Sequence, residues 1–171
     1  MKLKIPPKIP LTKEWVDILR NYYNFQYIQN VNQIPKDALW STSCSKTKSS
    51  KKKGYPNEFY IGRYNKLFYK FTDLYNLEYG IISDKYGIHM QDECLDYYDI
   101  HPSNLSIEDK YELGRIVRDK VLKYGFKEII FYYPSPLQST PYFEILWYSK
   151  LPVSYISKIK ILEKNKLKCQ G

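Results

Sequence analysis

Short apolar segments with strand character alternate along this chain with longer segments of helical periodicity. The segments 38–43, 77–83 and 126–133 are rich in β-branched and aromatic residues, which is typical of buried strands. Between them, apolar residues recur at helical spacing over 63–76 and 106–125. Such alternation favours parallel strands joined by right-handed helical crossovers. The sequence therefore predicts an α/β fold with three layers: a mainly parallel central sheet of about four strands, with helices on both faces.

Three more elements are expected near the ends of the chain. A helix capped by Thr12 should run to about Asn24, a second should cover 140–150, and a last strand should run over 152–162 into a basic tail. With 171 residues and 43% hydrophobic content, the chain is long enough for one core. We expect an N-terminal arm and helix, 1–36, packed on a single α/β domain, 37–171.

The net charge of +9 and the pI near 9.2 suggest an anionic partner, with nucleic acid first among the candidates. The 19 tyrosines could stack on unpaired bases, although each of them could equally belong to the core. No apolar segment reaches membrane-spanning length and three cysteines imply no disulfide framework. We expect a cytoplasmic protein without a membrane partner; its oligomeric state is not predicted.

Three polar loops follow the predicted strands: SCSKTK at 43–48, SDKYG at 83–87 and YPSPLQS at 133–139. Parallel strands place their carboxyl ends at one edge of the sheet, which is where ligands of such folds bind. The three loops should therefore converge there on one site.

The SCSKTK loop combines hydroxyl groups and ammonium groups that could hold a phosphate, although it lacks the P-loop motif. Cys44 beside lysines could have a lowered pKa and act as a nucleophile, or it could be a small buried residue at a strand end. Lys46 could clamp a phosphate or, if desolvated, act as an amine nucleophile. Asp84, paired with a nearby cation, would stay ionised and orient it or accept a proton.

Acidic residues are concentrated between 83 and 101, together with the two histidines, His89 and His101. The carboxylates Asp84, Asp92 and Asp99 could bind magnesium as in a nuclease. His89, Cys94 and His101 with Cys44 could hold zinc, but their spacing fits no compact zinc motif. No metal ligands and no cofactor are therefore assigned.

These motifs carry a family resemblance over about 38–105. SCSKTK, FYIGR, IISDKYGI and QDECLDYYDI, in this order, resemble an uncharacterised prokaryotic and phage domain. KYGI with the downstream YD is distantly similar to the peroxide-stress family. The cysteine and lysine loop and YYDIHPS resemble the catalytic domain of archaeosine synthase, which has a uracil-DNA-glycosylase-like α/β fold. Asp84 stands where the domain has a small residue, His89 where it has an aliphatic one, and the lysine-transfer motif of archaeosine synthase is missing.

The resemblance implies chemistry on a nucleobase, in tRNA or DNA or as a free base or nucleoside. The candidate catalytic residues are Cys44, Lys46, Asp84 and Asp99. The candidate substrate- or phosphate-binding residues are Ser43, Ser45, Thr47, Lys48, Arg63, Lys85, Tyr86 and Gly87. We expect an enzyme of base or nucleoside modification or of N-glycosidic chemistry. A noncatalytic basic nucleic-acid-binding protein and a metal-dependent nuclease remain as alternatives.

Overall fold

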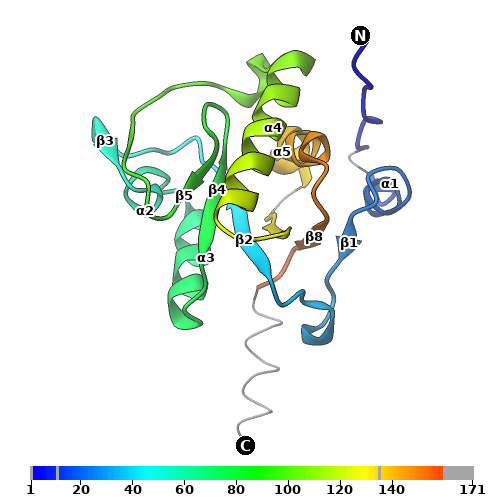
Figure 1. The fold of residues 1–171 in the computed structure, drawn as a ribbon, viewed down its shortest axis with the longest axis horizontal. Coiled ribbons are helices and arrows are strands. Elements are labelled where there is room, and N and C mark those ends of the chain that lie inside the picture. The colour runs from blue at the N-terminus through cyan, green and yellow to red at the C-terminus, as the bar shows by residue number, and fades with distance from the viewer. Residues whose placement is uncertain (1, 11, 135, 160–171) are drawn as a thin grey trace, which may run out of the picture.

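The computed structural model describes residues 2–10, 12–134 and 136–159. Its centre is a sheet of six strands in the order β1-β8-β7-β2-β4-β5, in which only β5 is antiparallel to its neighbour (Figure 1). The strands of this sheet are β1 Gln26–Tyr27, β2 Ala38–Ser43, β4 Tyr79–Ser83, β5 Gly87–Met90, β7 Glu128–Tyr132 and β8 Val153–Ile156. A separate two-stranded antiparallel sheet joins β3 Lys53–Gly54 to β6 Leu95–Asp96.

Five α-helices and two short 3₁₀ helices lie within the described ranges. They are α1 Trp15–Asn21, α2 Pro56–Phe59, α3 Arg63–Leu74, α4 Ile107–Lys123, α5 Pro136–Ser149, η1 Val31–Gln33 and η2 Pro102–Asn104. None of the helices in this part of the chain has both the length and the apolar character needed to cross a bilayer.

The α/β class and the mainly parallel sheet are confirmed, but the prediction of about four strands is wrong. The two additional strands are β1, which has only two residues, and β5, which reverses directly after β4. Neither is long enough to show a period of its own, since each is defined by the strand on which it pairs. The predicted range 38–43 matches β2 as observed.

The ends of three predicted elements differ from the structure. The first helix begins at Trp15 and ends at Asn21, and Asn24 has a left-handed backbone with φ of 58° that cannot continue it. The helix predicted over 140–150 already begins at Pro136, because proline is accepted in a first helical turn. The last strand ends at Ile156, and the remainder of its predicted range from 160 lies outside the described residues.

Helices cover both faces of the sheet. On one face, Phe68 of α3 stacks on Tyr132 of β7 with ring centroids 6.3 Å apart. Phe143 of α5 instead contacts Phe131 and Tyr133, at 5.2 and 5.5 Å. Because successive side chains along a strand point to opposite faces, α3 and α5 lie on opposite sides of β7. This arrangement gives the three layers expected from the sequence.

The N-terminal segment is part of this architecture. Residues of β1 pair in parallel with β8, so the segment forms one edge of the central sheet. Leu19 of α1 is fully buried, and Trp15 packs edge-on against Tyr133 at 5.0 Å. The segment therefore adds an edge strand as well as a helix packed on the domain.

The strand order creates a crevice at the carboxyl end of β2. The chain passes from β2 through α3 to β4 on one side of β2, and later reaches β7 on the other side. When two adjacent parallel strands are followed by loops that run in opposite directions, the two loops move apart. The gap between them is a ligand site at this point of the sheet. The loops after β2, β4 and β7 all begin there.

A capping box stands at the start of α4. The Ser106 hydroxyl accepts the Asp109 N–H at 3.0 Å, while the Asp109 carboxylate accepts the Ser106 N–H at 2.8 Å. These bonds satisfy two amides that the helix itself leaves without acceptors.

Removing this cap should weaken the domain measurably. We expect Ser106→Ala to lower the free energy of unfolding by about 1 kcal/mol, because the Asp109 N–H in the first turn of the helix loses its side-chain acceptor. Urea unfolding followed by circular dichroism checks this value. Ser106→Thr retains the hydroxyl and should lose less; equal losses for the two variants would contradict the capping explanation.

Candidate functional site

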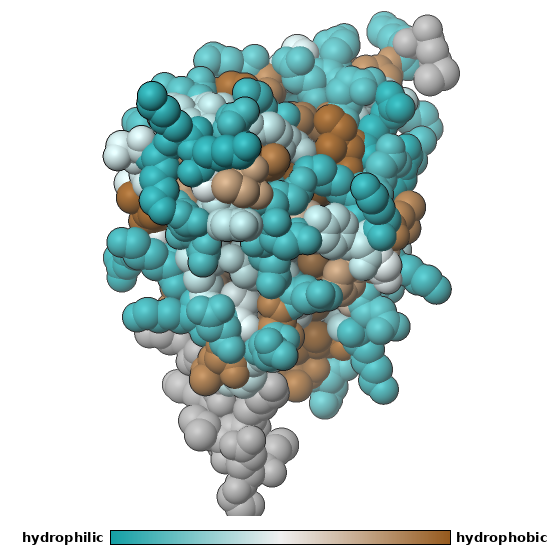
Figure 2. Space-filling model, turned by 60° about the vertical axis from the view of Figure 1, so that its left-hand side comes forward, coloured by the Kyte–Doolittle hydropathy of each residue, from teal (hydrophilic) through white to brown (hydrophobic). Residues whose placement is uncertain are grey.

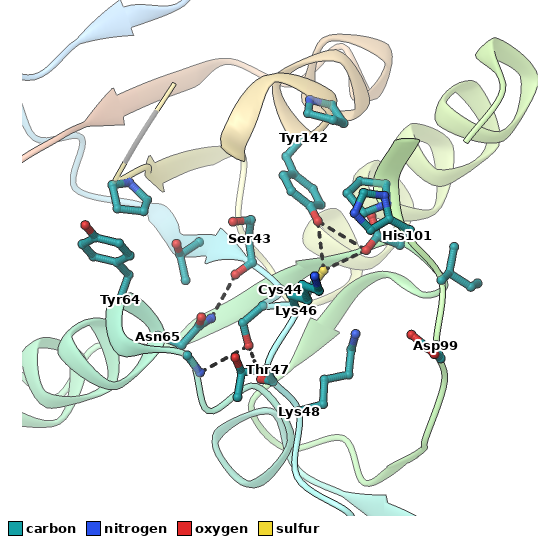
Figure 3. Close-up of a pocket in the computed structure, with 18 of the residues that line it drawn as sticks. Ser43, Cys44, Lys46, Thr47, Lys48, Tyr64, Asn65, Asp99, His101 and Tyr142 are labelled. Atoms are coloured by element: carbon teal, nitrogen blue, oxygen red, sulfur yellow. Dashed lines mark hydrogen bonds between the residues drawn. The ribbon is translucent and has the colours of Figure 1, made fainter. Parts of the chain in front are cut away.

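A pocket of about 620 Å³ occupies the crevice at the carboxyl end of β2. The loops after β2, β4 and β7 form it together with the first turn of α3, the segment 99–103 and part of α5 (Figure 3). Its volume is in the range of small-molecule sites. The predicted meeting of the first two loops is confirmed, since the Cys44 Sγ lies 3.1 Å from the Asp84 Oδ2.

Most of the residues singled out from sequence line this pocket. The four candidate catalytic residues are all present: Cys44, Lys46, Asp84 and Asp99. Five of the eight candidate binding residues are also present: Ser43, Ser45, Thr47, Lys48 and Arg63. The other three, Lys85, Tyr86 and Gly87, are not among the lining residues.

These three residues shape the turn between β4 and β5. Gly87 has a left-handed φ of 70°, and a Cβ there would lie 2.9 Å from the Leu113 carbonyl oxygen. Only glycine fits the left-handed backbone and the close approach at position 87. The Tyr86 hydroxyl donates to the Asp96 carbonyl at 2.9 Å, and the Lys85 Nζ lies 5.4 Å from the Tyr86 ring centroid. The KYG motif therefore supports the turn rather than the pocket.

Three polar side chains from distant parts of the chain meet at the floor of the pocket. The Cys44 Sγ and the Tyr142 hydroxyl both lie against the Asp84 Oδ2, at 3.1 and 3.3 Å, and 3.3 Å from each other. Figure 3 shows Tyr142 reaching from α5 toward Cys44. The second oxygen of Asp84, Oδ1, is buried and has no hydrogen-bond partner in the described structure. One carboxylate oxygen is thus held by two donors while the other is unused.

Burial dominates the protonation of this cluster. Burial, followed by the neighbouring Asp84 charge as a second cause, raises the pKa of the Cys44 thiol to about 12. Burial also raises the pKa of Asp84 above the usual carboxyl range, although the Cys44 and Tyr142 donors and the Lys48 charge oppose this effect. Of the two alternatives for Cys44, the buried residue fits and the lysine-activated thiolate does not, and among the described residues Asp84 makes no ion pair that would keep it ionised as expected.

The protonated state of Cys44 should be visible as low reactivity. At pH 7.5 we expect iodoacetamide to label the exposed Cys94 and to leave Cys44 unmodified in the folded protein, because the thiolate is the reactive form. Peptide mass spectrometry assigns the label to each cysteine. Unfolding in urea should expose Cys44 to the reagent; rapid native labelling of Cys44 would contradict the buried, protonated thiol.

The opposite side of the pocket is cationic. Lys46 and Arg63 are exposed at its rim, while the Lys48 Nζ lies 4.8 Å from the Tyr98 ring centroid and points into the cavity in Figure 3. An exposed Lys46 suits a phosphate clamp better than a desolvated amine nucleophile. Asp99 also lines this pocket, at the far side of Lys48 in Figure 3.

A chain of buried hydrogen bonds supports the wall behind Lys48. The Ser83 hydroxyl donates to the Tyr98 hydroxyl at 2.8 Å, which lies 3.2 Å from the Tyr60 hydroxyl. Tyr60 in turn lies 3.3 Å from the His89 Nδ1, and the His89 Nε2 lies 2.6 Å from the Glu93 carbonyl. Since a carbonyl only accepts, Nε2 carries the proton and Nδ1 accepts from Tyr60.

These hydrogen bonds exclude His89 from the sets of metal ligands that were considered from the sequence. Both of its ring nitrogens are engaged, and burial lowers its pKa, which favours the neutral form. Asp92 accepts a hydrogen bond from the Tyr124 hydroxyl at 2.7 Å, and it is not among the residues that line the pocket. Among the described residues, no group of three or more His, Cys, Asp or Glu side chains is placed to hold a metal ion.

Tyr142 and Asn65 line the pocket but were not among the residues singled out from sequence. Asn65 is buried in the first turn of α3, and its amide donates to the Ser43 carbonyl at 2.9 Å, which holds the end of β2 against the helix. The third predicted loop pointed to the region of Tyr142 but not to this residue. The available signal was the predicted helix over 140–150, which contains Tyr142 and directly follows that loop.

The surface beside the pocket is mainly hydrophilic. Figure 2, turned to bring the side of β3, α2 and α3 forward, shows hydrophilic residues with small separate hydrophobic areas. Exposed aromatic residues on these elements include Tyr55 and Tyr64.

Comparisons with known proteins found no relative of this chain. No protein-family model, no curated protein and no solved structure matches it.

Proposed function

We propose that this protein is an enzyme that acts on a nucleobase or nucleoside, by base modification or N-glycosidic chemistry, with Asp84 as its general acid or base. The observation that carries the proposal is the buried, unpaired Oδ1 of Asp84 in a pocket of suitable size. An unsatisfied buried carboxylate oxygen is costly for the folded protein, which is typical of a group reserved for a substrate.

The environment of Asp84 suits proton transfer. A carboxyl group whose pKa is raised by burial can hold a proton closer to neutral pH and deliver it to a ring nitrogen. In the N-glycosidic form of the reaction, the proton passes from Asp84 to a ring nitrogen of the base, and the C1′–N bond breaks with its electron pair going to the base. Water then adds to C1′ and releases a proton to the carboxylate, which restores Asp84.

Cys44 and Tyr142 would position this carboxyl group. Both donors contact Oδ2, so they fix the plane of the carboxyl group and leave the buried Oδ1 as the oxygen without a partner in the described structure. Lys46 and Lys48 would bind phosphate groups of the substrate, with Asp99 as a second acidic group at the same pocket. The substrate would be a base in tRNA or DNA, or a free nucleobase or nucleoside, in the cytoplasm.

Noncatalytic nucleic-acid binding is the second candidate, because the net charge of +9 also fits a protein that only contacts phosphates. The closed floor of the pocket favours the enzyme, since phosphate contacts alone need no buried carboxylate. The nuclease alternative has less support, because the described acidic residues form no three-ligand metal group.

Mass spectrometry tests the proposal in two steps. Small molecules and RNA fragments that co-purify with the protein are identified first, and the matching nucleoside or oligonucleotide is then incubated with it. We expect a free or altered base in the second step. Binding of an RNA or DNA fragment without any change in its bases would favour the noncatalytic candidate.

A further inference from the structure

We infer that the pocket binds its ligand as a nucleotide in one orientation, with a phosphate at the first turn of α3 and an N–H group of the base at Asp84. The base half of this assignment rests on the proposed function. The phosphate half stands on the geometry of α3 and the loop after β2.

The N-terminus of α3 lacks the groups that normally complete a helix start. Its N-cap is Gly62, no side chain of the described residues caps its amides, and its first turn contains no acidic residue. The first turn nevertheless faces the pocket, since Gly62, Arg63, Tyr64 and Asn65 all line it. The uncapped amides and the positive end of the helix dipole together favour an anion at this position.

The loop after β2 is held tightly against this helix start. The Gly62 N–H donates to the Ser45 hydroxyl at 3.3 Å, and a Cβ on Gly62 would lie 2.8 Å from the Ser45 Cβ. A side chain at position 62 would therefore push the loop away. The close approach brings Lys46 and Lys48 to the same pocket as the α3 amides.

The cations around this subsite are not neutralised by acidic partners. Elsewhere Lys110 pairs with Glu144 at 2.8 Å and Lys120 pairs with Glu93 at 2.9 Å. No ion pair involves Lys46, Lys48 or Arg63 within the ranges that the structure describes, although all three line the pocket. Their charges are thus available to an anionic ligand.

An independent observation shows that a phosphate alone cannot be the whole ligand. Asp84, which lines the same pocket, is only 4% exposed, and its buried Oδ1 lacks a donor among the described residues. In its ionised form, Asp84 repels a phosphate but accepts an N–H group. The ligand therefore carries an anion at one end and a hydrogen-bond donor at the other, which describes a nucleoside phosphate.

The test measures thermal unfolding midpoints with inorganic phosphate and with the four nucleoside 5′-monophosphates, at constant ionic strength. For the unaltered protein we expect a rise of about 3–6 °C at a ligand concentration near ten times Kd. Arg63→Met and Lys46→Met should each weaken phosphate binding about ten-fold or more, since each removes a charged contact. Lys70→Met, an exposed lysine on the same helix outside the pocket, is the matched control and should bind like the unaltered protein.

Asp84→Asn separates the two halves of the inference. This variant should retain the response to inorganic phosphate, because its α3 subsite is unchanged, but lose the tighter binding of a nucleotide relative to phosphate. A phosphate response that is equal in Arg63→Met and in the unaltered protein would overturn the phosphate subsite. A nucleotide preference that survives Asp84→Asn would overturn the assignment of the base.

The same measurements keep this inference distinct from the proposed enzyme activity. Phosphate binding that depends on Arg63, without any change in a bound base, retains the subsite and rejects the activity. Base release by a protein whose stability does not respond to phosphate retains the activity and rejects the phosphate subsite. Unfolding curves without ligand show whether each variant is folded before its binding is compared.

Discussion

Replacing Asp84 by Asn should abolish turnover without unfolding the protein. We expect a loss of about 10²- to 10⁴-fold in the rate of base release or base modification, because the amide cannot exchange a proton with the substrate. The Asn oxygen can still accept the hydrogen bonds that Cys44 and Tyr142 donate to Oδ2. Rates are compared by mass spectrometry on the substrate found by co-purification.

The same variant should be at least as stable as the unaltered protein at neutral and higher pH. Burial raises the folded-state pKa of Asp84 above its unfolded value, so the folded protein binds this proton more tightly than the unfolded chain. Its stability contribution is therefore present at low pH and is lost as the pH rises from the unfolded to the folded pKa. Asp84→Asn removes this penalty.

Urea unfolding at several pH values measures the difference between the two proteins. The gain in the free energy of unfolding of Asp84→Asn over the unaltered protein should be largest above the folded pKa of Asp84. It should disappear toward acid pH. The matched control is Asp96→Asn, an exposed aspartate of β6 outside the pocket, which should change neither rate nor pH dependence. Full activity of Asp84→Asn would reject Asp84 as the acid or base, whatever its stability.

Gly114→Ala should destabilise the packing of α4 against α5. In a free helix, alanine is more favourable than glycine by about 1 kcal/mol. Here a Cβ would lie 2.6 Å from the Tyr148 Cβ and 2.7 Å from the Ile145 carbonyl oxygen, so α4 and α5 would have to separate. We expect the free energy of unfolding to fall by about 1–3 kcal/mol, since overpacking outweighs helix propensity.

Chemical denaturation of the variant against Leu122→Ala tests this explanation. Leu122 is exposed on the same helix, and its truncation should change stability by less than about 0.5 kcal/mol. Because α5 also carries Tyr142 into the pocket, Gly114→Ala should weaken nucleotide binding as well. A Gly114→Ala protein that is more stable than the original would show that the two helices do not require this close approach.

Local sequence patterns determined much of the framework of this protein. The apolar runs of β2, β4 and β7 and the helical spacing of α3 and α4 are properties of neighbouring residues, so the sequence alone predicted them. The convergence of the first two loops followed from the alternation of strands and helices, because parallel strands end at one edge. The capping box of α4 was likewise contained in four consecutive residues, 106–109.

The character of the site was decided by residues far apart in the chain. Cys44 is 40 residues from Asp84 and 98 residues from Tyr142, and no local pattern shows that the three side chains meet. From the sequence, Cys44 could be either a reactive thiolate beside lysines or a small buried residue, and Asp84 was expected to be ionised beside a nearby cation. In the folded protein their burial raises the pKa of both groups, because desolvation outweighs the more distant cations, and only the tertiary structure determines which groups are removed from water.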